Sequence, residues 1–519
     1  MKRLFVLMLA ASAIVTACGD DDDATSGGGG SSSAGKGGSS AGESDAGSGG
    51  SDAGKAGSSA IAGTMNGGEG GASPVGTDGG AAGAMSAAGM AGEGGSASDL
   101  FTVTLENVAS VKSYTSSGVF NTPVGDATPG PLTPGKKYEF TIEAGRKQKL
   151  SFATMLAATN DLFFGPDGDG IALYADNGDP ISGFVTDQIS LWDAGTEVNE
   201  EPKVGANTVS KQAAPNTGPA ENGNVVDIAD TTDTFDYPSA ADVMTVQITH
   251  VTGTQFKVTI SNVSSDMALM TSGGNFPAPL SPGVWVVHNG KDALFTEGMP
   301  DRGKGLEHLA EDGNVTDLAA FAASTSGITF PASPGVFVVH EAGTEPLFTG
   351  GVADYAKGLE HIAEDGNPSQ LGGNLSQLSG YVSGAVFNMP VGSAAPGPIL
   401  PGSQYSFSFH ASRGQMLSFA TMLAATNDVF FAPAASGIPL FDEDGQPVSG
   451  DVSDQVSLWD VGSEANERPG IGPNTVTNQS APDTGDGGEG KVQRLDDVND
   501  GFTYPAPNAV LKVTIKSGE

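Results

Sequence analysis

Apolar and polar residues alternate along many short stretches of this chain. In 101–106 the apolar residues fall at every second position, which is the period of a half-buried β-strand. Two similar stretches, 244–250 and 256–260, flank a Thr-Gly-Thr turn and predict a hairpin. Further strands are predicted at 138–142, 150–155, 284–287 and 336–339. Since the connections are rich in proline and glycine, the pattern predicts an all-β fold of antiparallel β-sandwiches, with short helices at 303–312 and 356–365.

The chain also contains internal repeats. Residues 118–252 match the C-terminal arm, 385–519, without a gap, and the segment 151–161 recurs letter for letter as 418–428. The shorter matching pairs are 281–288 with 333–340, 304–314 with 357–367, and 101–108 with 256–263. Such repeats indicate a duplicated domain whose middle segment is unevenly shared between the two units.

The repeats predict two domains, 99–253 and 254–519, of which the first lacks a middle segment and the second has two. A unit without that segment would expose core side chains and leave strand edges unpaired, which proteins avoid. We therefore expect 276–316 to complete the first unit and 101–108 to fill the vacant place in the second. The alternative is sequential packing, with the extra segment as an appended layer.

Residues 1–18 have the features of a targeting signal. A positive start at 1–3 is followed by an apolar run that is too short to span a bilayer and is typical of a secretory signal peptide. Ala17 and then Cys18, the only cysteine of the chain, follow this run in the manner of a bacterial lipobox. We expect Cys18 to carry a lipid anchor to the membrane, and Gly19 in the place of aspartate favours the outer membrane or the cell surface. The alternative is an ordinary signal peptide with an incidental cysteine.

Composition predicts a linker and excludes several classes of partner and site. The segment 19–98 holds 27 of the 77 glycines and no aromatic residue, so it cannot bury enough apolar area to fold and is predicted to be a disordered linker. The formal net charge of −38 argues against a nucleic-acid partner, whose binding face would be basic. A single cysteine leaves no intrachain disulfide and no cysteine-based metal site.

Several motifs of this chain resemble the spondin N-terminal domain family. The matching motifs, which follow one another in the order of the family, are Ser-Pro-Gly-Val-Trp at 281–285, Gly-Leu-Glu-x-x-Ala-Glu-Asp-Gly at 305–313, Ser-Phe-Ala-Thr-Met-Leu at 418–423, Asn-Asp-x-Phe-Phe at 427–431 and Leu-Trp-Asp-x-Gly-x-Glu at 458–464. The resemblance covers nearly all of 101–519 and implies extracellular antiparallel sandwiches that bind Ca²⁺ in loops at one end. It also implies a role in adhesion and matrix contact rather than catalysis.

Carried over residue by residue, the resemblance implies one Ca²⁺ site in each repeat. The implied ligands are Asp161, Asp193 and Glu197 in the first repeat and Asp428, Asp460 and Glu464 in the second. The chemistry agrees, because Ca²⁺ prefers loop carboxylates and would remove their mutual repulsion. Gly195 and Gly462 would permit the turn that brings the glutamates back. The alternative is a set of solvated loop acids in a very acidic protein.

Other candidates are weaker. His308 and His361 each precede a Glu-Asp pair on a predicted helix, but the sequence positions no third metal ligand, and an exposed capped helix explains the pattern as well. His288 and His340 end matched strands and are expected at a strand edge, whereas Trp192 and Trp459 are expected in the core.

No nucleophile elbow, phosphate loop or pair of catalytic acids is found, so we do not expect an enzyme. The first functional hypothesis is a surface lipoprotein whose calcium-ordered loops bind an extracellular protein, matrix or glycan partner. The second is a structural envelope protein that self-associates without a soluble ligand. A metal-dependent extracytoplasmic hydrolase is a remote third, because nothing predicts an open coordination position in a pocket.

Overall fold

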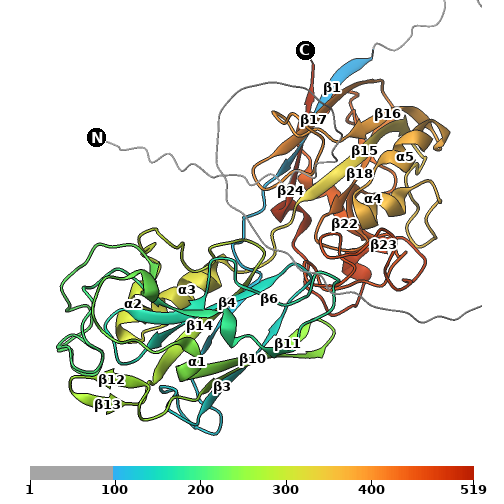
Figure 1. Ribbon diagram of the computed structural model, residues 1–519. Helices are drawn as coiled ribbons and strands as arrows, with labels where there is room; N and C mark the ends of the chain where they lie inside the picture. Colours follow the sequence, from blue (N-terminus) through green and yellow to red (C-terminus); the bar gives the residue numbers. More distant parts are fainter. Residues whose placement is uncertain (1–97, 519) are drawn as a thin grey trace, which may run out of the picture. The chain divides into compact units, whose positions relative to one another are not determined.

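A computed structural model describes residues 98–518 (Figure 1). The expected signal peptide, Cys18 and the linker 19–98, apart from its last residue, lie outside the described residues. Strands predominate in the described part, nearly all pairing is antiparallel, and the helices are short, so the predicted all-β class is confirmed. None of the helices within 98–518 has the length and apolar character needed to cross a membrane.

The first sandwich is built from two sheets that share one core. Its larger sheet has the order β2-β14-β4-β5-β8-β9, with β6 paired to β4: β2 (Ser116–Phe120), β14 (Leu280–His288), β4 (Lys149–Leu156), β5 (Leu162–Pro166), β8 (Ile189–Asp193), β9 (Val226–Asp227) and β6 (Ile171–Ala172). Its smaller sheet has the order β3 (Lys137–Glu143), β11 (Gln255–Asn262), β10 (Met244–Thr252) and β7 (Gly183–Phe184). Phe152 and Phe164 from the larger sheet pack with Phe256 and Val246 from the smaller one, so the core lies between them.

The second sandwich repeats this plan. Its larger sheet has the order β16-β15-β18-β19-β22-β23, with β20 paired to β18: β16 (Tyr381–Phe387), β15 (Ala332–Glu341), β18 (Gln415–Leu423), β19 (Val429–Pro433), β22 (Val456–Asp460), β23 (Gln493–Arg494) and β20 (Ile438–Pro439). Its smaller sheet has the order β17 (Gln404–Ala411), β1 (Asp99–Asn107), β24 (Leu511–Ser517) and β21 (Gly450–Asp451). Phe101 and Val103 of β1 are fully buried in this second core.

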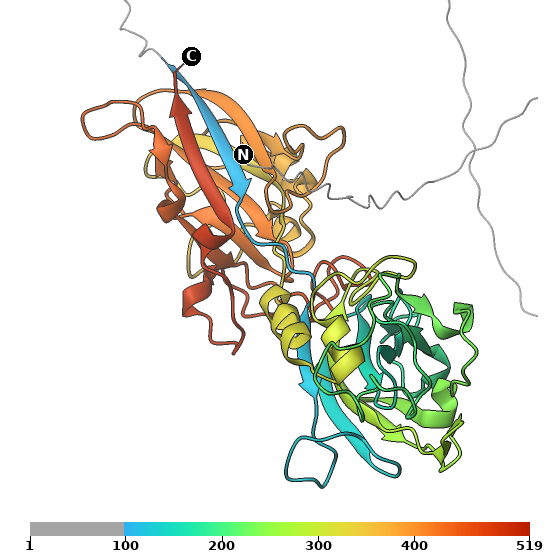
Figure 2. The same cartoon turned by 90° about the vertical axis from the view of Figure 1, so that its left-hand side faces the viewer.

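Strands are exchanged between the two repeats, as the repeat pattern predicts. β14 pairs with β2 and β4, and β11 pairs with β3 and β10, so both complete the first sandwich. β1 lies between β17 and β24 of the second sandwich, which Figure 2 shows as a blue strand between orange and red ones. Sequential packing is contradicted, and the boundary between 99–253 and 254–519 does not follow the sheets.

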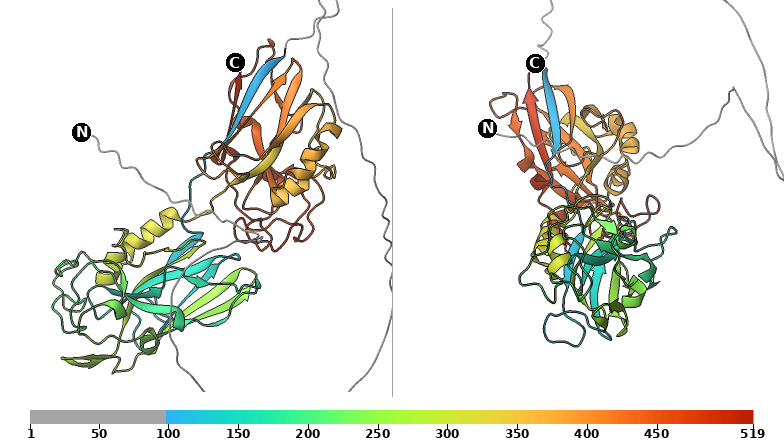
Figure 3. Two further views of the ribbon diagram at one scale, coloured as in Figure 1. Left: turned by 45° about the horizontal axis from the view of Figure 1, so that its top comes forward. Right: turned by 60° about the vertical axis from the view of Figure 1, so that its left-hand side comes forward.

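Helices cover the outer face of each larger sheet (Figure 3). They are α2 (Leu306–Asp312) and α3 (Thr316–Thr325) in the first sandwich, and α4 (Leu359–Asp365) and α5 (Ser369–Asn374) in the second. Leu306 and Leu309 of α2 pack on Val284 and Val286 of β14, which is why the central strands are apolar on both faces. The structure bears out the predicted helices, although α2 and α4 each begin three residues later than expected, and it adds α3 and α5.

The remaining described elements are small. They are the helix α1 (Ala240–Val243), the hairpin strands β12 (Leu269–Thr271) and β13 (Gly274–Phe276), and 3₁₀ turns at 186–188, 228–230, 375–377, 453–455, 495–497 and 507–509. In α1 the Ser239 hydroxyl and the Asp242 carboxylate form a capping box, which satisfies the first N–H groups of this short helix.

The aromatic and histidine predictions have different outcomes. Trp192 and Trp459 are core residues, 2% and 7% exposed, and each indole N–H donates to a backbone carbonyl. His288 is the last residue of β14 and His340 is the last but one of β15, but the expectation of an edge position is wrong, since both strands are internal and both imidazoles are buried. Each imidazole Nε2 meets a serine hydroxyl of the next strand, at 2.9 Å from Ser151 Oγ in the first sandwich.

The exchange predicts which fragments fold. A fragment of residues 113–327 contains all the strands of the first sandwich and should unfold cooperatively, whereas 99–253 lacks β11 and β14 and should be molten or aggregated. Losing the buried Val284, Val286 and Val287 alone forfeits roughly 1.5–3 kcal/mol per side chain, a large part of the stability of a domain. Circular dichroism melting of the two fragments checks this, and a cooperative transition in 99–253 would contradict the exchange.

Candidate metal centres

Strand pairing brings the predicted aspartates together in each sandwich. Asp161 directly precedes β5 and Asp193 is the last residue of β8, and the register pairs Leu162 with Asp193. In the second sandwich Asp428 precedes β19 and Asp460 ends β22, with Val429 opposite Asp460. Both pairs therefore lie at one end of two adjacent antiparallel strands, where the loops begin.

Asp161 is a buried carboxylate with one unsatisfied oxygen. Its side chain is fully buried, and Oδ2 accepts the backbone N–H groups of Thr196 and Glu197 at 3.2 and 3.0 Å. Oδ1 is buried and has no hydrogen-bond partner. Asp193 is also buried, but its two oxygens accept from Gly195 N–H at 2.7 Å and from Asn199 Nδ2 at 2.6 Å. A buried charge with an unpaired oxygen is costly unless a cation compensates it.

The third carboxylate that the structure groups with Asp161 and Asp193 belongs to Glu221, and that of Glu197 is not in this group. Oxygen atoms of Asp161, Asp193 and Glu221 all lie within 4.8 Å of one another. The Glu197 carboxylate instead accepts from Gly218 N–H at 2.6 Å and Asn160 Nδ2 at 3.3 Å, so this residue reaches Asp161 through its backbone N–H. Sequence reasoning missed Glu221 because it lies in the loop after the motif and the repeat places Gly488 opposite it.

The second centre has the same frame with one carboxylate fewer. Asp428 is fully buried, its Oδ2 accepts Glu464 N–H at 3.2 Å, and its Oδ1 has no partner. Asp460 accepts from Gly462 N–H at 2.6 Å and from Asn466 Nδ2 at 2.9 Å. The Glu464 carboxylate, like that of Glu197, is held by a glycine N–H and an asparagine amide.

The predicted glycine turns are present in both copies. Gly195 and Gly462 adopt φ of 68° and 73°, in the left-handed region that favours glycine. A Cβ on Gly195 would lie 2.5 Å from the carbonyl oxygen of Asn224, so a larger residue would displace this loop. The turn directs the backbone N–H groups of the following residues toward Asp161.

Burial governs the electrostatics of these centres. Burial raises the pKa of Asp161 well above its usual value, and the nearby Asp193 raises it further. Asp428 has a raised pKa for the same two reasons, with Asp460 as its neighbour. Since each aspartate pair is costly to ionise, a divalent cation between the carboxylates would offset the desolvation and the repulsion. The residues present therefore fit Ca²⁺, and the better fit is the first centre with its three carboxylates.

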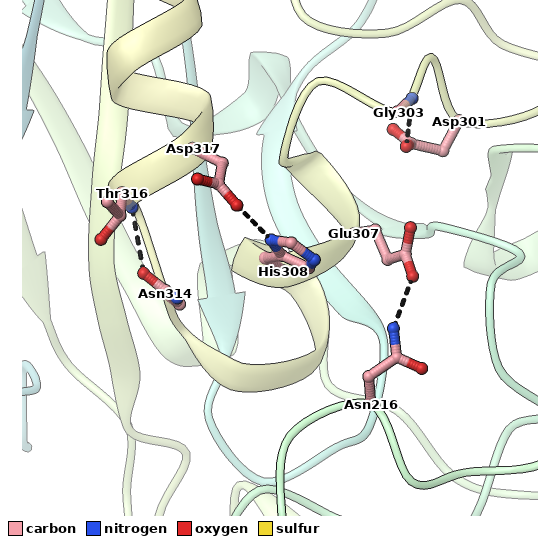
Figure 4. Close-up of polar contacts among 8 residues, drawn as sticks. All are labelled: Asn216, Asp301, Gly303, Glu307, His308, Asn314, Thr316 and Asp317. Carbon is pink, nitrogen blue, oxygen red and sulfur yellow. Dashed lines mark hydrogen bonds and ion pairs between the residues drawn. The ribbon is translucent and has the colours of Figure 1, made fainter.

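A second acidic feature lies on the helix side of the first sandwich. Glu197, Asp301, Glu307 and Glu311 line a cavity of about 460 Å³, and Figure 4 shows two of these residues, Asp301 and Glu307. Glu311 is 1% exposed and its Oε2 has no partner. Burial raises the pKa of Glu311 to about 7, although the neighbouring hydroxyl of Thr196 acts to lower it.

Comparison with known proteins adds no relative. No protein-family model matches this chain, and no curated protein is similar to it in sequence. The spondin resemblance therefore rests on the motifs and their order along the chain.

Glu311 predicts a pH dependence of stability in the absence of divalent ions. Its pKa is about 7 in the folded state and 4.5 as its ordinary value, so the folded state binds the proton more tightly. The unfolding free energy should therefore rise as the pH falls from about 8 to about 4.5, by at most about 3 kcal/mol from this group. Glu311→Gln should remove that part of the slope in urea unfolding with a chelator present.

The two ends of this pH range serve as internal controls. At about pH 8 Glu311→Gln should be more stable than the wild type, because no charge is buried, and near pH 4.5 the two should agree. An unchanged slope in the variant would show that the buried carboxyl does not carry the effect.

Proposed function

We propose that this chain is a lipid-anchored cell-envelope protein whose two spondin-type sandwiches bind Ca²⁺ and, through the calcium-ordered loops, an extracellular protein or glycan. The observation that carries the proposal is the pair of fully buried aspartates, Asp161 and Asp428, each with an Oδ1 that no donor satisfies. The same buried oxygen without a partner occurs in both repeats, which favours a cation site over solvated loop acids.

The donor set favours calcium over smaller or softer metals. The loop centres offer carboxylate oxygens and no histidine or cysteine, which suits a hard cation. Ca²⁺ also tolerates irregular loop geometry, whereas Mg²⁺ requires a near-ideal octahedron. Glu221 lies on a long loop between β8 and β9, so calcium would connect this loop to the rigid ends of β5 and β8.

Ordering of that loop is how calcium would act on binding. The segment 194–225 contacts the centre at several points: through Gly195, Thr196 and Glu197 near its start and through Glu221 near its end. A cation held by Asp161, Asp193 and Glu221 would tie the two ends of the loop together. The exposed middle of the loop would then present a fixed surface to a partner.

The proposed location in the cell envelope rests on the first 18 residues. A signal peptide that ends at a lone Cys18 supports a lipid anchor, and the glycine-rich segment after it would act as a tether. If this location is right, mass spectrometry should find an acylated cysteine at the N-terminus of the mature protein.

Calcium should stabilise both sandwiches. We expect two Ca²⁺ per chain by calorimetry of the full chain, and a rise in melting temperature equivalent to about 2.7 kcal/mol at a hundredfold excess over the Kd. Because the first centre has Glu221 where the second has Gly488, the two affinities should differ, with the first tighter. The double variant Asp193→Asn with Asp460→Asn should lose most of the rise.

A matched pair of variants assigns each affinity. Glu221→Gly copies the second centre into the first and should make the two affinities similar, while Gly488→Glu should strengthen the second. Asp176→Asn, in an exposed turn away from both centres, should change neither. If the double aspartate variant keeps the full calcium shift, the assignment of the sites is wrong.

Partner binding should depend on calcium. Purified protein immobilised through its C-terminus should retain extracellular glycan or protein ligands from a defined panel with Ca²⁺ present and release them in a chelator. Self-association that is insensitive to Ca²⁺, measured by sedimentation velocity, together with no retained ligand, would instead favour the structural envelope protein.

A further inference from the structure

The second sandwich contains a histidine-carboxylate cluster that is separate from the loop centres. Ligand atoms of His361, Asp365 and Asp483 lie within 4.8 Å of one another. His361 and Asp365 are half-buried and Asp483 is exposed, so the cluster is open to solvent on one side. His361 Nδ1 is 3.7 Å from Asp483 Oδ1, which leaves room for an atom to bridge them.

Two parts of the chain build this cluster. His361 and Asp365 are four residues apart on α4, so they share one face of the helix. Asp483 comes from the long loop between β22 and β23. Gln479 Nε2, on the same loop, donates to Asp365 Oδ1 at 2.9 Å and orients the carboxylate, which leaves Oδ2 available.

The first sandwich has the same scaffold but not the cluster. Figure 4 shows His308, the counterpart of His361, with its Nδ1 bonded to Asp317 Oδ2 at 2.7 Å. The position of Asp483 is taken by Asn216, whose Nδ2 donates to Glu307 Oε1 at 2.8 Å. The repeat places Gln370 opposite Asp317. In the second sandwich the aspartate near the histidine is therefore Asp483, from the long loop.

A buried glutamate behind the cluster gives an independent reason for a cation. Glu364, next to Asp365 on α4, is only 4% exposed. Its neighbours are the hydroxyl of Ser463 and the carboxyl group of Asp483. In the first sandwich the equivalent Glu311 has an Oε2 with no partner at all. A buried carboxylate against a second carboxylate is repulsive unless a positive charge lies between them.

We propose that His361, Asp365 and Asp483 bind a divalent transition metal, with Zn²⁺ as the representative ion. An imidazole nitrogen with two carboxylates is a Zn²⁺ donor set, and the nitrogen selects against Ca²⁺. This site is independent of the calcium centres, because none of its ligands belongs to them.

Calorimetry tests the site on the full chain. The chain is produced without the lipid, and its free Cys18 thiol is first blocked with iodoacetamide. The protein is then freed of metal with a chelator, and ZnCl₂ is titrated with CaCl₂ in excess so that the loop centres are filled. We expect one Zn²⁺ per chain at high affinity. Co²⁺ as a second probe should give visible d–d absorption that Zn²⁺ abolishes.

Variants taken from the repeat identify the ligands. Asp483→Asn copies Asn216 and should weaken Zn²⁺ binding roughly 10–100-fold or more, as should His361→Ala. His308→Ala, at the matching position of the first sandwich, should have no effect. Conversely, Asn216→Asp with Asp317→Gln should create a second Zn²⁺ site in the first sandwich, which a merely structural role of these residues would not do.

The outcomes are separable from those of the calcium proposal. Wild-type affinity for Zn²⁺ in both Asp483→Asn and His361→Ala would overturn this site, whatever the calcium titration gives. Equal loss in His308→Ala would also overturn it. Melting of each variant with Ca²⁺ present checks that it is folded, and Asp365→Asn provides a second ligand substitution if one variant is not.

Discussion

A strand inside a sheet that is covered on both faces needs a neighbour on each side, and this requirement organises the whole molecule. β4 and β18 are buried nearly throughout, since a second sheet covers one face and helices cover the other. β14 meets the requirement for β4, and β15 meets it for β18. The first sandwich obtains its strand from beyond its own repeat, and the second accepts β1 in return. The acidic centres depend on this frame, because paired strand ends hold their aspartates together.

Much of the fold could be read from the sequence because its signals are local. Alternation located the strands, and the uneven repeats indicated the exchange. Helix α3 was missed although Leu318 and Ala322 have helical spacing, because its alanine-rich sequence lacks a strong apolar stripe and follows α2 after a short turn. The burial of His288 was also missed, since a terminal histidine on an apolar strand looks the same whether the strand is internal or at an edge.

Of the predicted site residues, the structure brings together those that lie at the ends of strands. Asp161 and Asp193 were implied by the family resemblance, on motifs that lie at strand ends in the structure, whereas Glu221 and Asp483 come from long loops whose path no local pattern specifies. The repeat was misleading here, because a ligand that is present in only one copy looks like an ordinary substitution when the two copies are aligned. Glu221 against Gly488, and Asp483 against Asn216, are the substitutions that make the two sandwiches chemically different. Their scaffolds have remained nearly identical while their ligands have diverged.

The place of β1 has a mechanical consequence. The chain enters β1 at Asp99 and leaves it at Asn107 toward β2 of the first sandwich, so β1 is the covalent link between the N-terminal segment and that sandwich. Tension applied to the first sandwich by a bound partner, and resisted at the N-terminus, would travel along β1. Hydrogen bonds to β17 and β24 flank this strand on both sides, so sliding it out requires many of them to break together. The second sandwich therefore holds, within its own smaller sheet, the strand through which this tension would pass.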